Sequence, residues 1–94
     1  MTAWGTAKEI ETRRRIRLAV WAYAYEYRAD SIVPDYVFDF ESNMVDLNIR
    51  TDRPDLDIFF VIHFNSYTGS WIHYHPELPK IAQIYEHHYR NGEH

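Results

Sequence analysis

Two aromatic side chains and two carboxylates occur at spacings that would place them at one end of a pair of helices. Tyr25 lies late in the first predicted helix. Asp35, Phe38 and Asp39 follow at i, i+3 and i+4 and share one face of the next helix. Rings stack on flat ligands, and carboxylates accept hydrogen bonds and attract positive charge, so the pattern predicts a small-molecule pocket. The alternative is that both rings are core residues and that the aspartates simply favour a helix N-terminus.

The segment that carries these residues, Tyr25–Asp39, reads YEYRADSIVPDYVFD. It resembles the N-terminal Ia domain of bacterial NAD-dependent DNA ligases, a helical hairpin that binds the nicotinamide mononucleotide (NMN) half of NAD. The family pattern is Tyr-His, an aspartate with nine residues between it and the tyrosine, and Tyr-Asp after two more. Tyr25, Asp35 and Asp39 match it at identical spacing. The resemblance covers about residues 10–50, and small phage proteins described only as ligase-related look similar over most of this length.

Two positions depart from the family pattern. Phe38 stands where the family has tyrosine and keeps a ring that could stack on a pyridine. Glu26 stands where the family has histidine, and a carboxylate near the ligand phosphate should repel it. The resemblance therefore implies NAD or NMN as the ligand, with the nicotinamide riboside part favoured over the mononucleotide. The ligand-binding residues that it implies are Tyr25, Glu26, Asp35, Phe38 and Asp39.

Sequence motifs for catalysis or metal binding are not evident. The ligase nucleotidyltransferase core needs a Lys-x-Asp-Gly motif, and the two lysines, Lys8 and Lys80, lie in other contexts. Three glycines at positions 5, 69 and 92 cannot form a phosphate-binding loop. The six histidines match no standard zinc spacing. We therefore expect a protein that is not an enzyme and that needs no metal.

Four arginines precede the apolar half of the first predicted helix: Arg13, Arg14, Arg15 and Arg17. Such a cluster is typical of a solvated helix face that pairs with nearby acids, here Glu9 and Glu11. The alternative is a contact with an anion or an acidic partner. The net charge of −4 argues against general binding to nucleic acid.

The chain is rich in aromatic residues, with three Trp, eight Tyr and five Phe. Three of them surround the predicted loop after the third helix: Trp71, Tyr74 and Tyr67. They could anchor a protein interface, because aromatic residues dominate interface hot spots, or Trp71 could instead plug the bundle. The rival function is thus a phage-type regulator or inhibitor that binds a host protein, with a vestigial pocket. A homodimer is consistent with the same residues.

Helical periodicity predicts the elements that would position these residues. A helix is expected over Thr6–Arg28, opened by a Thr6–Glu9 capping box. The next is expected over Asp35–Asn48. A third helix is favoured over Asp55–Phe64, where the apolar run Ile58–Ile62 could instead be a buried strand. Ser70–His75 is expected to be extended or irregular, and a last helix should span Pro76–Arg90. The inward residues are predicted to be Val37, Phe40, Met44 and Leu47 in the second helix and Leu78, Ile81, Tyr85 and His88 in the last.

Length and composition fit one domain. The 94 residues contain no cysteine and no apolar run long enough to span a membrane, so a cytoplasmic protein is expected, in the host cytoplasm if it is phage-encoded. The predicted fold is a small all-α bundle of about four helices over residues 1–94. It is built on an antiparallel hairpin at 10–50, followed by further helices and a loop at 51–94.

Overall fold

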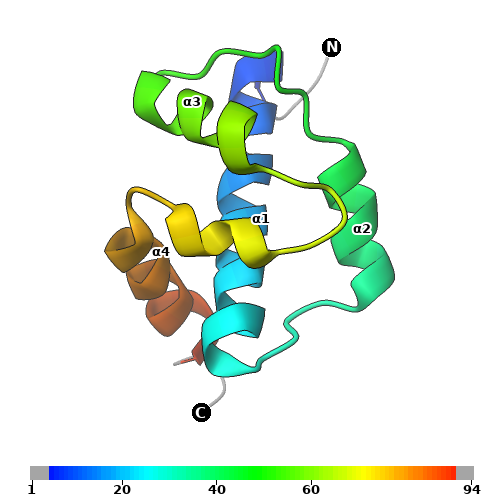
Figure 1. Cartoon of the computed structure of the whole chain (residues 1–94), viewed down its shortest axis with the longest axis vertical. Helices are drawn as coiled ribbons and strands as arrows, with labels where there is room; N and C mark the ends of the chain where they lie inside the picture. Colours follow the sequence, from blue (N-terminus) through cyan, green and yellow to red (C-terminus); the bar gives the residue numbers. More distant parts are fainter. Residues whose placement is uncertain (1–4, 91–94) are drawn as a thin grey trace.

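Helix α1 (Ala7–Arg28) is the longest element and runs through the middle of the molecule (Figure 1). The computed structural model describes residues 5–90. After α1 come α2 (Asp35–Asn43), α3 (Pro54–His63), the 3-10 helix η1 (Ser70–Tyr74), α4 (Leu78–Tyr85) and a π-helical turn, η2 (Glu86–Arg90). Residues 5–90 contain no strand, so the predicted all-α bundle is confirmed. None of the described helices is long and apolar enough to cross a membrane.

Helix α1 begins and ends where local sequence signals place it. The Thr6 hydroxyl accepts a hydrogen bond from the Glu9 amide at 3.2 Å, and the Glu9 carboxylate accepts one from the Thr6 amide at 2.9 Å, which confirms the capping box. At the other end Ala29 adopts the left-handed conformation, with φ of 51°. This residue turns the chain away from the helix and towards α2.

Helix α2 packs through a different face from the one predicted. Ser42 is buried and Phe38 packs against the core, whereas Phe40 is 63% exposed and Met44 is 48% exposed. The predicted inward set of Val37, Phe40, Met44 and Leu47 is therefore wrong. Both faces have helical periodicity, and the more apolar one was favoured. Glu41 favours the observed face, because its carboxylate forms ion pairs with Arg14 and Arg17 of α1.

Helix α2 also ends five residues before the predicted boundary, at Asn43. The cause lies in α1. The Glu11 carboxylate accepts a hydrogen bond from the Asp46 amide at 3.1 Å, and the Arg15 guanidinium donates to the Asp46 and Ile49 carbonyls at 2.8 and 3.0 Å. These long-range bonds hold residues 46–49 in turns, and their backbone groups are no longer available for helical bonds.

Helices α3 and η1 supply the aromatic part of the core. Helix α3 is confirmed, while the segment expected to be irregular forms a 3-10 helix. Trp71 is only 2% exposed, and its ring lies 5.3 Å from that of Phe60 and 5.4 Å from that of Phe64. Such tilted and edge-to-face contacts between rings stabilise a small core.

The last predicted helix is interrupted near its end. Ile81 and Tyr85 are buried as predicted, but His88 is exposed, so its inward placement is wrong. The π-helical turn η2 widens the helix and changes which residue faces inward. Tyr89 takes the place of His88: it packs against the core, and its ring stacks on that of Tyr85 at 6.4 Å.

His75, which follows η1, makes folding depend on pH. It is 9% exposed, and burial lowers the pKa of its imidazole below the ordinary value of 6.5. The unfolded chain therefore takes up a proton at a higher pH than the folded protein, and His75 lowers stability as the pH falls below about 6.5. We expect the free energy of unfolding to drop more steeply from pH 7 to pH 5 in the wild type than in His75→Phe. Urea denaturation at each pH measures both slopes, and equal slopes would contradict this assignment.

Candidate ligand pocket

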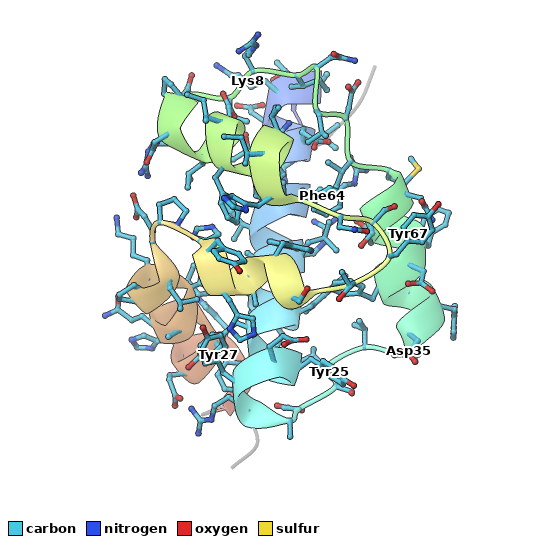
Figure 2. All side chains as sticks on the ribbon, viewed as in Figure 1. Lys8, Tyr25, Tyr27, Asp35, Phe64 and Tyr67 are labelled. Carbon is cyan, nitrogen blue, oxygen red and sulfur yellow. The ribbon has the colours of Figure 1, made fainter. Side chains whose placement is uncertain are left out.

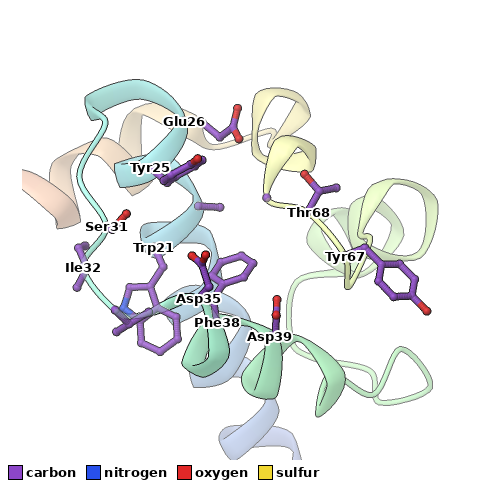
Figure 3. Close-up of a pocket in the computed structure, with 13 residues that line it drawn as sticks. Trp21, Tyr25, Glu26, Ser31, Ile32, Asp35, Phe38, Asp39, Tyr67 and Thr68 are labelled. Carbon is purple, nitrogen blue, oxygen red and sulfur yellow. The ribbon is translucent and has the colours of Figure 1, made fainter.

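A pocket of about 340 Å³ opens between the end of α1, the turn after it, the start of α2 and the loop at 67–69 (Figure 3). We call it the α1–α2 pocket. All five residues predicted to bind a ligand line it: Tyr25, Glu26, Asp35, Phe38 and Asp39. Tyr25 and Asp35 lie at the same end of the molecule, on either side of the α1–α2 turn (Figure 2). The structure thus brings the predicted set together in one place.

Three rings contribute to this pocket, one more than the sequence predicted. Tyr25 is largely exposed, whereas Phe38 and Trp21 are half-buried and pack against the core. Figure 3 shows Trp21 beside Phe38 and Tyr25 across from them. Trp21 was missed as a pocket residue, although its position one helical turn before Tyr25 places both on the same face.

Gly69 allows the loop to close one side of the pocket. A Cβ atom at this position would lie 3.2 Å from the Ala22 Cβ and 3.5 Å from the Phe38 ring. The absence of a side chain therefore lets the loop approach α1 and α2 closely. Tyr67, two residues earlier, is also among the lining residues, but it is 91% exposed and its ring points away from the pocket (Figure 3).

Three carboxylates give the α1–α2 pocket its charge. Those of Asp35 and Asp39 are exposed, lie on the pocket side of α2 and accept no hydrogen bond from any residue of the described range 5–90. Glu26 supplies the third from α1. None of the described residues that line the pocket is Lys, Arg or His. Such a site attracts a cation and disfavours a phosphate.

The Glu26 carboxylate is held in place by η1. His73 Nε2 lies 2.9 Å from Glu26 Oε1, and His73 Nδ1 lies 2.9 Å from the Tyr27 hydroxyl. A carboxylate can only accept, so His73 Nε2 donates to Glu26. His73 is 47 residues from Glu26, and no local pattern connects the two.

The four arginines lie outside the α1–α2 pocket and mostly bind carboxylates. Arg15 is 6% exposed and binds Glu11 at 2.8 Å and Asp57 at 3.0 Å. Arg14 and Arg17 both reach Glu41 of α2. Arg13 is exposed on α1. Arg14 and Arg15 pair with Glu11, as predicted. Glu9, the other predicted partner, instead caps the N-terminus of α1. Arg15 is buried rather than exposed to solvent.

The three aromatic residues named as interface candidates lie in different environments. Trp71 belongs to the core, which agrees with the alternative that it plugs the bundle. Tyr74 is 67% exposed, and its ring stacks on that of His63 at 4.8 Å. Tyr67 lies at the rim of the α1–α2 pocket. The structure therefore does not gather the three into one surface.

Comparison of the chain with models of protein families, with curated proteins and with solved structures found no match. The ligase resemblance consequently rests on the residues of Tyr25–Asp39.

Proposed function

We propose that the protein binds the nicotinamide nucleoside part of NAD or NMN in the α1–α2 pocket, without catalysing a reaction on it. The observation that supports this proposal is the meeting of aromatic rings and carboxylates in a pocket with no cationic lining residue in the described chain. Nicotinamide riboside is a flat pyridinium cation with an amide and ribose hydroxyls. Each part of that ligand has a chemical counterpart in the pocket.

The pyridinium ring would stack on the aromatic side chains that face the pocket, Trp21, Tyr25 and Phe38, of which Tyr25 is the most accessible. Its positive charge is attracted both by the ring faces and by the carboxylates. Asp35 and Asp39 would accept hydrogen bonds from the amide or from the ribose hydroxyls, and charge-assisted bonds of this kind are the strong ones. A volume of about 340 Å³ lies in the range of small-molecule sites.

The 5′-phosphate distinguishes between the candidate ligands. With three carboxylates and no cationic lining residue among those described, the charged groups of the pocket all repel the phosphate. The Glu26 Oε1 atom accepts a hydrogen bond from His73, which keeps the carboxylate in place. We therefore expect nicotinamide riboside to bind more tightly than NMN or NAD.

Isothermal titration calorimetry with nicotinamide riboside, NMN and NAD tests the proposal. We expect micromolar binding of the riboside, weaker binding of both phosphorylated ligands, and at least a tenfold loss for the riboside in Asp39→Asn, which removes the charge at nearly constant shape. Reduced nicotinamide riboside, which is uncharged, should also bind more weakly. The matched control is Asp52→Asn, an exposed carboxylate outside the pocket, which should change nothing. No heat with any ligand, or an unchanged affinity in Asp39→Asn, would refute the proposal.

The second candidate function is regulation or inhibition of a partner protein, with the α1–α2 pocket vestigial. Large apolar residues that a core would normally bury are exposed on the outer faces of α2 and α3: Tyr36, Phe40, Met44, Ile58, Val61 and Ile62. Exposed apolar patches of this kind mark interaction sites. A negative calorimetric result would favour this candidate.

A further inference from the structure

A second cleft, of about 220 Å³, lies between α1, the segment 51–53, α3 and the α4 region, and shares no lining residue with the α1–α2 pocket. We call it the α1–α4 cleft. Most of its surface is apolar and comes from Ile16, Leu56, Phe60, Ile81 and Ile84. Ile16 remains 41% exposed although it sits on the central helix, because the cleft leaves it uncovered.

The charged side chains around this cleft already have partners. Arg15 is bound by Glu11 and Asp57, and Asp52 by Lys8. Arg53 is shared between Asp55 and Glu77, and Lys80 lies 3.6 Å from Glu77. The two lining hydroxyls donate internally, that of Thr12 to the Lys8 carbonyl and that of Thr51 to Asp57. A charged ligand would have to compete with these pairs.

His75 is the exception among the polar lining residues. Its Nδ1 accepts a hydrogen bond from the Glu77 amide at 3.0 Å, so the proton of the neutral ring is on Nε2. The ring packs against Phe59, with centroids 4.9 Å apart. No acceptor for Nε2–H occurs within residues 5–90, although the side chain is more than nine-tenths buried. The Nε2 atom is not one of the fully buried unpaired atoms of the described residues, so a molecule in the cleft that His75 lines can reach it and supply the missing acceptor.

We propose that the α1–α4 cleft is a second binding site, for a neutral apolar molecule with a single hydrogen-bond acceptor such as a ketone or ester carbonyl. The acceptor binds His75 Nε2–H, and the apolar body packs on Ile16, Leu56 and Ile84. Neutrality follows from the ion pairs around the cleft, and a single acceptor follows from His75 Nε2–H, the one uncommitted donor among the uncharged side chains that are described as lining it. Burial lowers the pKa of His75, which keeps the ring neutral and the Nε2 proton available at pH 7.

The volume limits the size of this ligand. At about 30 Å³ for each water molecule in the liquid, a space of 220 Å³ corresponds to roughly seven waters, or a ligand of seven to nine heavy atoms. Acetophenone meets all three criteria of size, neutrality and one acceptor. Isopropylbenzene has nearly the same shape but lacks the carbonyl oxygen, which makes it the matched control ligand.

Titration of the isotope-labelled protein with both compounds, followed by NMR, tests the proposal at pH 7. We expect saturable shifts of the methyl groups of Ile16, Leu56 and Ile84 and of the His75 Nε2–H signal, with acetophenone bound about tenfold more tightly than isopropylbenzene. The imidazole signal gives this result in the wild-type protein, without any substitution. Equal affinities, or shifts that do not saturate because the cleft holds only water, would overturn the proposal.

Substitution then identifies the donor. His75→Phe keeps a ring in the same place and removes the N–H, so the tenfold preference for acetophenone should disappear while both compounds still bind. His63→Phe changes an exposed histidine that stacks on Tyr74 instead, and it should keep the preference. A preference that survives in His75→Phe would place the carbonyl elsewhere and refute the assignment. Neither result depends on nicotinamide binding, because the two sites share no lining residue.

Discussion

Replacing Arg15 with alanine is expected to lower the free energy of unfolding by about 3–5 kcal/mol, because it leaves the buried Asp57 carboxylate without a cation and the buried Glu11 carboxylate with Arg14 alone. Arg15 bonds to Glu11 and Asp57, which are themselves almost fully buried. Its remaining donors bind the Asp46 and Ile49 carbonyls. One guanidinium on α1 therefore connects this helix to the segment after α2 and to α3, and its loss disrupts both connections.

Urea denaturation of Arg15→Ala and Arg17→Ala provides the comparison. Arg17 bonds to Glu41 in a half-exposed pair, so its loss should cost less than about 1 kcal/mol. Arg15→Lys should also be strongly destabilising, because one ammonium group cannot replace a guanidinium that donates to four acceptors. A loss below about 1 kcal/mol in Arg15→Ala would show that the network contributes little. It would also reopen the interpretation of the arginine cluster as a contact for an external anion.

The parts of the fold that the sequence predicted correctly depend on neighbouring residues. The capping box at Thr6 needs only four consecutive residues. The predicted residues of the α1–α2 pocket lie on two consecutive helices joined by one short turn. The sequence spacing from Tyr25 to Asp39 therefore largely determines that they meet. Local spacing and a short connection are what sequence patterns report reliably.

The features that were missed depend on contacts between distant segments. Arg15 is 31 residues from Asp46 and 34 from Ile49, and these bonds set the end of α2. Periodicity could not choose between the two faces of α2, because the choice is made by Glu41 and its partners on α1. His73 likewise reaches Glu26 from η1. Such pairings position side chains at a pocket without leaving a local signal in the sequence.

Trp71 illustrates the same limit and carries the second large effect. An aromatic residue in a short apolar stretch suits a core as well as an interface, and only its neighbours decide. Here they are Phe59, Phe60 and Phe64, and the indole lies in the centre of the aromatic cluster. We expect Trp71→Ala to lower the free energy of unfolding by about 3–5 kcal/mol, as for other large buried aromatic residues.

Two further variants, followed by thermal and urea denaturation, separate a core role from an interface role. Trp71→Phe should cost much less than Trp71→Ala, because it keeps most of the ring and removes an indole N–H that has no acceptor among the described residues. Tyr74→Ala, an exposed ring on the same 3-10 helix, should change stability by less than about 1 kcal/mol. If Trp71→Ala were as mild as Tyr74→Ala, the indole could not be a core residue, and a partner-binding role for Trp71 would regain support. If the core role holds, Trp71 is not a partner contact, and the surface that supports the second candidate function is formed by the exposed apolar residues of α2 and α3.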